Sequence, residues 1–220
     1  MNQVKIKAVL FDMDGTLTDT EKFYQEAWPQ TLAHFGYKMT PEMPLELRSL
    51  GRPFVVEKFK EWYGDDFDYW KIREYRKKQV EDILKENGIP LKPGCKEILQ
   101  WLRDNNIFIS LVTANDRERA ERYLKKIGLF EYFNAVVCAD MVERGKPAPD
   151  IYAYACKTLD VEPECTFAIE DSPNGIRSAH DAGCNAVMIP DLTEPDEELQ
   201  KLLYARLDNL LEIKNLFPTY

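Results

Sequence analysis

Histidine is nearly absent from this sequence of 220 residues, which contains only His34 and His180. So few histidines argue against a histidine-rich metal site and against acid–base chemistry centred on imidazole. The five cysteines form none of the closely spaced pairs that mark zinc and redox motifs, so we expect them to be reduced and mostly buried thiols. Any catalytic chemistry is therefore expected to depend on carboxylates.

Long hydrophobic runs and an excess of positive charge are also missing. The longest apolar run near the N-terminus covers residues 8–11, far short of a signal-peptide core or of the roughly 20 residues in a membrane span. The chain has 29 Lys and Arg against 38 Asp and Glu, and a nucleic-acid backbone would repel the resulting net charge of −9. We expect a cytoplasmic protein, a monomer, that binds neither nucleic acid nor membranes.

The remaining composition is that of a globular protein, with 45% hydrophobic and 30% charged residues. Short β-favouring runs alternate along the chain with segments of helical spacing. The runs cover residues 4–11, 107–112, 135–139, 166–169 and 186–189, and the expected helices between the later runs cover 94–105, 116–127 and 147–159. This alternation predicts an α/β fold, with a Rossmann-like parallel sheet covered by helices.

The first two β-favouring runs are separated by residues 12–106, whereas a crossover connection needs only about a dozen residues. Helical spacing recurs within this stretch, over residues 21–35, 53–63 and 69–86. The aromatic side chains available there for a separate small core are Phe23, Trp28, Phe59, Trp62, Tyr69 and Trp70. We therefore expect an α-helical cap domain, residues 18–87, inserted into a core of residues 1–17 and 88–220.

Two carboxylates, Asp12 and Asp14, stand two residues apart where the chain leaves the first run, in the segment DMDGT. Alone, this segment is as typical of a turn as of a catalytic site, because Asp and Gly are common turn formers. A calcium loop of the EF-hand type is excluded, since Leu17 stands where its glycine is required. Thr113 follows the second run just before an expected helix, which suits either a helix N-cap or a phosphate site.

Charged residues also follow the third and fourth runs. Lys146 stands between Gly145 and Pro147, whose special backbone preferences suit a positioned cation, although a solvated surface lysine is the ordinary alternative. Glu170 and Asp171 precede an expected helix, whose dipole they could simply complement. All these groups lie at the carboxyl ends of successive parallel strands, where open α/β sheets form their ligand crevice. Together they predict one site.

Gathered at one edge of a sheet, Asp12, Asp14, Glu170 and Asp171 would repel one another unless a cation joined them. Mg²⁺ fits this requirement, because it prefers oxygen ligands and retains waters and substrate phosphate oxygens in sites with few protein ligands. Lys146 would then face the same phosphate from another side.

Taken together, these motifs resemble those of the haloacid dehalogenase superfamily, in the branch that carries a helical cap after the first strand and contains phosphatases and β-phosphoglucomutase. The segments DMDGT, the Thr113 region, GKPAPD and IEDSPNG occur in the family's order and span nearly the whole chain. The resemblance implies that Asp12 is a nucleophile that forms an aspartyl-phosphate, and that Asp14 is the general acid and base. It also implies that Mg²⁺ is a cofactor.

The resemblance assigns further roles to the remaining residues. The implied phosphate-binding residues are Thr113, Ala114, Asn115 and Lys146. The implied Mg²⁺ ligands are Asp12, the backbone carbonyl of Asp14, and Asp171, with Glu170 either a ligand or a neighbour of the ligands.

Two cap residues bear on the substrate. Tyr24 stands where the mutase has a histidine that supports Asp14 and helps to suppress hydrolysis, so this departure favours a phosphatase. A hydrogen bond from the Tyr24 hydroxyl to Asp14, or packing within the cap, are the alternatives. Arg52 lies about where this branch has its substrate-specificity loop and is the best candidate for a substrate contact. The other basic cap residues considered for this role are Arg48, Arg76 and Lys77.

The expected function is Mg²⁺-dependent hydrolysis of a small phosphorylated metabolite, a sugar phosphate, through an aspartyl-phosphate. A phosphosugar mutase of the β-phosphoglucomutase type is the alternative. A receiver domain of a signalling relay uses a similar set of groups, but it is much smaller and lacks a helical insert after its first strand. A catalytically silent binding module is disfavoured because every polar group of the site is present.

Overall fold

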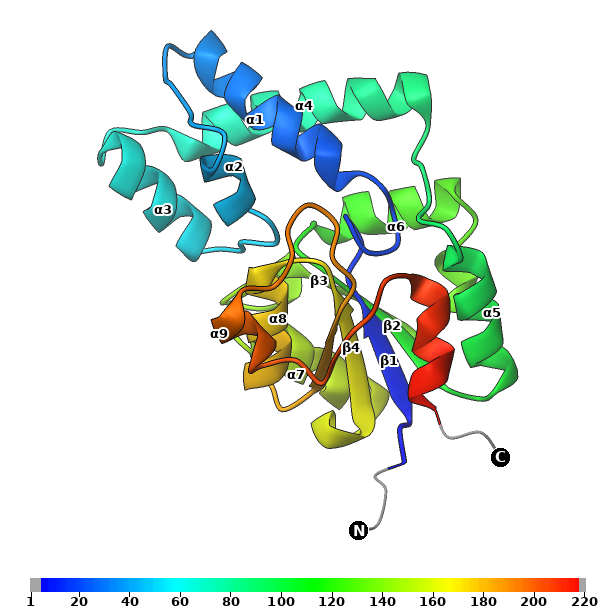
Figure 1. The fold of residues 1–220 in the computed structure, drawn as a ribbon. Helices are drawn as coiled ribbons and strands as arrows, with labels where there is room; N and C mark the ends of the chain where they lie inside the picture. Colours follow the sequence, from blue (N-terminus) through cyan, green and yellow to red (C-terminus); the bar gives the residue numbers. More distant parts are fainter. Residues whose placement is uncertain (1–4, 218–220) are drawn as a thin grey trace.

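The computed structural model describes residues 5–217, and a six-stranded parallel sheet lies at its centre (Figure 1). The strand order is β3-β2-β1-β4-β5-β6, and each neighbouring pair is parallel. The strands are β1 (Ala8–Phe11), β2 (Phe108–Thr113), β3 (Ala135–Cys138), β4 (Thr166–Glu170), β5 (Asn185–Met188) and β6 (Ala205–Arg206). The predicted α/β fold with a Rossmann-like sheet is confirmed.

Helices cover both faces of this sheet. Alternate residues of β1 enter opposite cores, Val9 and Phe11 on one face and Ala8 and Leu10 on the other. The first face carries α5 (Cys95–Asp104) and α6 (Arg117–Lys126), and the second α7 (Asp150–Leu159), α8 (Pro173–Asp181) and α9 (Glu197–Gln200). Short 3₁₀ turns cover Phe130–Tyr132, Ala139–Met141, Pro163–Cys165 and Leu210–Leu216. A strand buried on both faces has no polar side, which explains its uninterrupted apolar sequence.

The carboxyl ends of the central strands lie level with one another. In the sheet register, Phe11 at the end of β1 is opposite Leu111 of β2 and Ile169 of β4. The chain first builds β2 and β3 on one side of β1 and then returns to build β4, β5 and β6 on the other. Open α/β sheets form a ligand crevice where the strand order reverses in this way, so the residues that follow β1, β2 and β4 emerge around one crevice.

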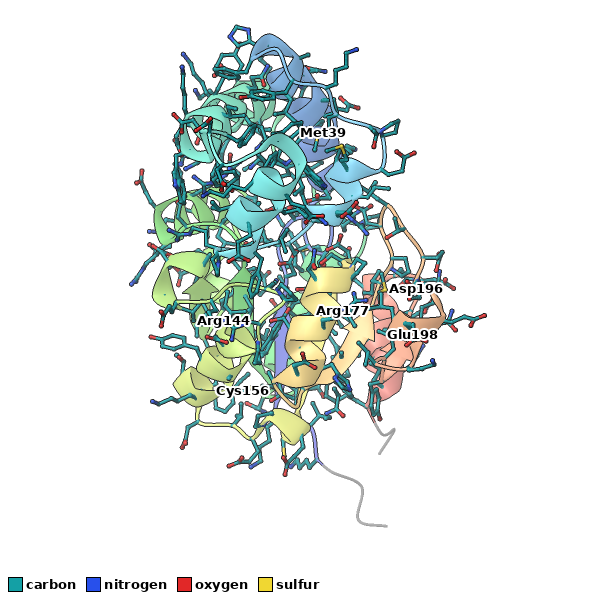
Figure 2. The ribbon with its side chains drawn as sticks, turned by 90° about the vertical axis from the view of Figure 1, so that its left-hand side faces the viewer. Met39, Arg144, Cys156, Arg177, Asp196 and Glu198 are labelled. Carbon is teal, nitrogen blue, oxygen red and sulfur yellow. The ribbon has the colours of Figure 1, made fainter. Side chains whose placement is uncertain are left out.

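Four further helices form a layer beyond this edge of the sheet (Figures 1 and 2). They are α1 (Glu21–His34), α2 (Met43–Glu46), α3 (Phe54–Tyr63) and α4 (Tyr69–Asn87). Trp28, Phe59 and Tyr69 belong to a hydrophobic cluster that these helices form among themselves. Because they share this separate cluster, we propose that residues 18–87 are a cap domain on a core of residues 1–17 and 88–220. Within residues 5–217, every helix is too short or too polar to serve as a membrane crossing.

Some elements differ from the sequence prediction. β1 begins at Ala8 rather than at residue 4, which lies outside the described residues. β6, α2 and α9 have two, four and four residues, too few to give a periodic signal. Trp70 is 47% exposed rather than part of the cap cluster, because it lies on the solvent side of α4 beside Arg52. Phe23, in the first turn of α1, packs against the sheet core instead.

The cysteines are all free, and only Cys165 is not fully buried. The Sγ atoms of Cys156 and Cys184 lie 3.7 Å apart, a contact that their spacing in the sequence did not indicate. Cys156 lies in the part of the core away from the cap helices (Figure 2). The prediction of mostly buried, unpaired thiols is confirmed.

Two glycines allow the cap to approach the core closely. The Gly51 N–H donates to the Lys146 carbonyl over 2.8 Å, and the Gly145 N–H donates to the Arg52 carbonyl over 2.7 Å. A Cβ on Gly51 would lie 2.7 Å from Gly145 Cα, and one on Gly145 would lie 2.9 Å from Gly51 Cα. Backbone atoms cannot move aside at such a contact as the end of a flexible side chain can. Both positions therefore need glycine if the cap loop at residues 51–52 is to lie against the backbone of Lys146.

We predict that Gly51→Ala separates the cap loop from the Lys146 loop, because the added methyl group would overlap the Gly145 backbone. Small-angle X-ray scattering should then give a larger radius of gyration than for the wild type. Lys78→Ala is the control, since Lys78 is an exposed position on α4 of the cap. Equal radii for the wild type and Gly51→Ala would contradict this account of the contact.

Candidate active site

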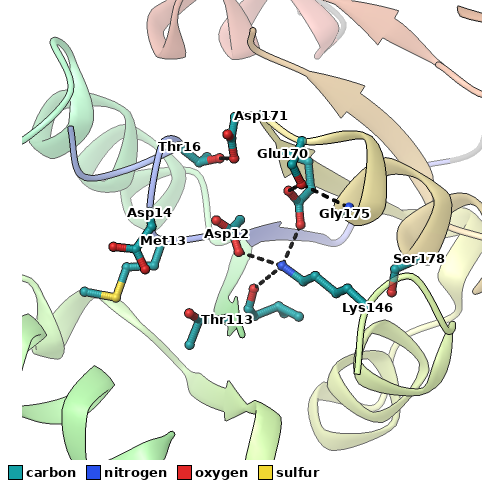
Figure 3. Close-up of polar contacts among 12 residues, drawn as sticks. Asp12, Met13, Asp14, Thr16, Thr113, Lys146, Glu170, Asp171, Gly175 and Ser178 are labelled. Carbon is teal, nitrogen blue, oxygen red and sulfur yellow. Dashed lines mark hydrogen bonds and ion pairs between the residues drawn. The ribbon is translucent and has the colours of Figure 1, made fainter. Parts of the chain in front are cut away.

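A buried lysine lies at the centre of the crevice (Figure 3). Lys146 Nζ donates to a carboxylate oxygen of Asp12 and to one of Glu170, over 2.6 Å each, and to the Val112 carbonyl over 2.9 Å. The Tyr152 hydroxyl from α7 donates to the same oxygen of Glu170 over 2.6 Å. The surface-lysine alternative is therefore wrong, because this side chain is 1% exposed and fully engaged by the ends of β1, β2 and β4.

Two glycines let the acidic residues lie directly against backbone. A Cβ on Gly175 would lie 1.9 Å from the Glu170 carboxyl carbon, so only glycine at this place in α8 leaves room for that side chain. Gly15 adopts φ +85°, and a Cβ there would lie 2.5 Å from Asp171 Oδ2. The glycines of DMDGT and IEDSPNG thus create the space in which the carboxylates gather.

Asp12, Glu170 and Asp171 form a cluster in which one oxygen of each lies within 4.8 Å of the others, and all three are buried. Burial raises the pKa of Asp12 well above its usual value; Lys146 opposes this rise, while Glu170 and Asp171 add to it. Burial likewise raises the pKa of Asp171, and Glu170 adds to the effect.

The donor set of this cluster suits a hard divalent cation. Asp171 Oδ2 is buried and accepts no hydrogen bond from the described residues, although Arg48 Nη1 lies 3.5 Å away. The Thr16 hydroxyl donates to the other oxygen, Oδ1, over 3.3 Å. An oxygen left free beside two further carboxylates is a suitable ligand for Mg²⁺. Asp12, Glu170 and Asp171 therefore fit the predicted cofactor.

The Asp14 carboxylate points away from this cluster (Figure 3). The Thr20 hydroxyl donates to its Oδ1 over 2.5 Å, and Asn115 Nδ2 donates to its Oδ2 over 2.6 Å. The side chain is partly exposed. Its carboxylate is not one of the clustered oxygens, and ligation through its backbone carbonyl stays a prediction.

The predicted phosphate-binding segment lies at the end of β2. The Thr113 hydroxyl accepts hydrogen bonds from the Asn115 N–H and from Asn115 Nδ2, each over 3.1 Å. Asp116, and not Thr113, caps α6, since its carboxylate accepts from the Arg119 N–H over 3.0 Å. Thr113, Ala114 and Asn115 instead line the same cavity as Asp12.

That cavity, of about 110 Å³, lies between the cap and the core. Of the two cap residues predicted to bear on the substrate, only one lines it. Tyr24 lines it, but its hydroxyl accepts from Arg119 Nη2 over 2.5 Å and has no hydrogen bond to Asp14. Arg52 is exposed and outside the lining, with its guanidinium 5.7 Å from the centre of the Trp70 ring. The structure therefore gives Arg52 no contact with the cavity.

Several residues of the site had no clear signal in the sequence. Arg119 is 3% exposed, and its place four residues before the buried Tyr123, on the inward face of α6, was the available clue. Arg48, considered above only for a substrate contact, is 2% exposed, lies beside Asp171, donates to the Thr193 hydroxyl and is not part of the cavity lining. Glu21, at the start of α1, is buried in the wall of the cavity. Each depends on how the cap packs on the core, which local patterns do not reveal.

The sequence matches a family model described as haloacid dehalogenase-like hydrolase over residues 9–189. The phosphorylated carbohydrates phosphatase of Thermotoga maritima is 31% identical over 188 residues, which cover 83% of this chain and 84% of that protein. The β-phosphoglucomutase of Bacillus subtilis is 31% identical over 188 residues, which cover 83% of this chain and 82% of the mutase.

Solved structures give the same picture. A mutant of CbbY from Rhodobacter sphaeroides, in complex with xylulose-(1,5)bisphosphate, matches with a TM-score of 0.80 and 29% identity, covering 94% of this chain and 96% of that chain.

The buried Glu21 carboxyl gives this site a pH-dependent stability. Burial, with the nearby charge of Asp14, raises the pKa of Glu21 from 4.5 to about 8. The folded protein then binds more protons than the unfolded chain between these two values, so the free energy of unfolding falls as pH rises through this window.

We predict that Glu21→Gln is more stable than the wild type at pH 8, by about 1–4 kcal/mol, and that the difference shrinks towards pH 5. Urea unfolding of the metal-free proteins at both pH values measures this difference. Glu26→Gln, an exposed position on the same helix, should behave like the wild type. A stability difference that does not change with pH would show that Glu21 is not the titrating group.

Proposed function

Because the chain belongs to the haloacid dehalogenase-like hydrolases, we propose that it is a Mg²⁺-dependent phosphatase of small phosphorylated metabolites, in particular sugar phosphates. The observation that carries this proposal is the contact of Lys146 with Asp12 and Glu170, beside Asp171, at the point where the strand order reverses. The relatives named for phosphorylated carbohydrates support the choice of substrate class.

In this proposal Asp12 is the nucleophile. One of its carboxylate oxygens attacks the phosphorus atom of the substrate, the bond from phosphorus to the ester oxygen breaks, and an aspartyl-phosphate forms. Lys146, whose Nζ lies 2.6 Å from Asp12 Oδ1, and the Thr113 hydroxyl, which lines the same cavity as Asp12, would hold the phosphoryl oxygens. Mg²⁺, held by Asp12, Asp171 and Glu170, would neutralise negative charge on the phosphoryl group.

Asp14 is the proposed general acid and base. It gives a proton to the leaving ester oxygen in the first step and accepts one from the attacking water in the second, which releases inorganic phosphate and restores Asp12. Its hydrogen bonds from Thr20 and Asn115 fix its orientation towards the cavity. Its partial exposure supports proton exchange with solvent between turnovers.

Hydrolysis is favoured over the mutase reaction by the surroundings of Asp14. The mutase in this branch has a cap histidine that supports this aspartate, whereas Tyr24 stands here and bonds to Arg119. Neither histidine of the chain is among the cavity residues. Water is therefore the acceptor that we propose for the phosphoryl group.

We predict that Asp12→Asn lowers the hydrolysis of p-nitrophenyl phosphate with Mg²⁺ by at least about 1000-fold, because the amide keeps the shape of the side chain but is not a nucleophile. Circular dichroism should show an unchanged fold. Asp65→Asn, at an exposed position in the cap, is the matched control and should retain full activity. Near-normal turnover by Asp12→Asn would refute the covalent mechanism.

The fate of the phosphoryl group can be measured directly. With β-glucose 1-phosphate and a trace of glucose 1,6-bisphosphate, we predict that inorganic phosphate appears and that glucose 6-phosphate does not accumulate ahead of it. Coupled assays for both products give this comparison in one reaction. Glucose 6-phosphate formed well before inorganic phosphate would identify a mutase instead.

A further inference from the structure

Arg76 of α4 is a cation without a partner in the wall of the cavity. Within residues 5–217 its Nε is buried and has no hydrogen-bond partner, and its guanidinium forms no ion pair. The guanidinium carbon lies 4.2 Å from the centre of the Trp28 ring and 5.1 Å from that of Tyr24. Two aromatic rings thus hold the side chain in place without neutralising its charge.

The groups around Arg76 add positive charge. Burial lowers the pKa of Arg76, the charges of Arg119 and Arg73 add to this effect, and Tyr69 and Tyr24 oppose it. Arg119 is also buried, and its Nη2 donates only to the hydroxyls of Tyr24 and Tyr123. Arg73 lines the same cavity, and its Nη1 lies 2.8 Å from a carboxylate oxygen of the exposed Glu74. Arg76 and Arg119 have no carboxylate partner within residues 5–217, and two such cations close together are unfavourable unless an anion joins them.

The geometry of the guanidinium suits such an anion. With one face of Arg76 against Trp28, its edge of N–H groups remains available for hydrogen bonds. A guanidinium edge matches the two oxygens of a carboxylate or a phosphate, and charge-assisted pairs of this kind are strong and directional.

The charges divide the cavity into two ends. Asp12, with Lys146 behind it, forms the end at the sheet, and Arg76 with Arg73 forms the end under the cap. Arg119 also lines the cavity, where its Nη2 donates to the Tyr24 hydroxyl. A short molecule with a negative group at each end would meet a matching partner at both.

We propose that Arg76, assisted by Arg73 and Arg119, binds a second anionic group of the substrate, at the end remote from the phosphoryl group transferred to Asp12. This inference rests on the proposed phosphatase function and narrows its substrate class to phosphomonoesters that carry a second phosphate or a carboxylate. The cavity of about 110 Å³ favours a short carbon chain between the two groups.

Three substrates with the same three-carbon chain test this inference. Glycerol 3-phosphate has a neutral remote end, 3-phosphoglycerate a carboxylate and propane-1,3-diyl bisphosphate a phosphate. The wild type with Mg²⁺ should prefer at least one of the charged pair over glycerol 3-phosphate by about 10- to 100-fold in kcat/KM, mainly through KM. Which of the two is preferred distinguishes a carboxylate from a phosphate as the natural group.

Arg76→Met keeps an unbranched side chain over Trp28 but removes the charge. It should lower the ratio of kcat/KM for the charged substrate to kcat/KM for glycerol 3-phosphate to about one. Arg122→Met is the matched control on α6, because Arg122 is half exposed, pairs with Glu81 and does not line the cavity. Arg73→Met tests the same site independently should Arg76→Met fold poorly. Isothermal titration calorimetry with 3-phosphonopropionate and propylphosphonate provides a readout that does not require turnover.

A wild type that hydrolyses p-nitrophenyl phosphate but shows no preference for the charged substrates would overturn this inference and leave the phosphatase proposal standing. The same holds if Arg76→Met keeps the full preference. Absence of Mg²⁺-dependent hydrolysis with every phosphate ester would refute the proposed function itself. Tighter binding of 3-phosphonopropionate than of propylphosphonate, lost in Arg76→Met, would then still support the anion site.

Discussion

Lys146 Nζ lies between Asp12 and Glu170, 2.6 Å from a carboxylate oxygen of each, and all three groups are buried. Removing a carboxylate from water is costly, and an attraction of this kind offsets the cost only when the geometry is good. Asp171 lies in the same cluster, so three carboxylates face two cations, Lys146 and Arg48, and one negative charge is left over. This excess of negative charge makes the crevice suitable for a divalent cation. A bound cation would in turn attract the oxygens of a phosphoryl group.

The same lysine links the chemistry to the position of the cap. Its carbonyl accepts a hydrogen bond from Gly51, so the loop that brings the ammonium group to Asp12 also holds the cap loop. On the other side of the cavity, α4 carries Arg76 under the cap, where its charge has no partner among the described residues. The cap helices therefore add positive charge to a core site dominated by negative charge.

The part of the site on the core was predictable because its residues lie at the ends of strands that the sequence itself indicates. Asp12 follows β1, Glu170 ends β4 and Lys146 lies on the loop after β3, and parallel strands bring their carboxyl ends together whatever the connections between them. The cap side was not predictable in the same way. Arg52 has the expected position in the chain but is exposed beside Trp70, whereas Arg119, for which the sequence indicated no role, is buried. Such outcomes depend on how helices from distant parts of the chain pack, and no local pattern encodes that.

The most direct test of the account is to find the phosphoryl group on the protein during turnover. Rapid acid quench of the enzyme with Mg²⁺ and substrate, followed by peptide mass spectrometry, should show the added mass of one phosphoryl group on Asp12. The label should disappear when Mg²⁺ is withheld, and it should be strongly reduced in Lys146→Met, which removes the cation next to Asp12. A label on a different residue, or rapid turnover with no label on any residue, would contradict the account.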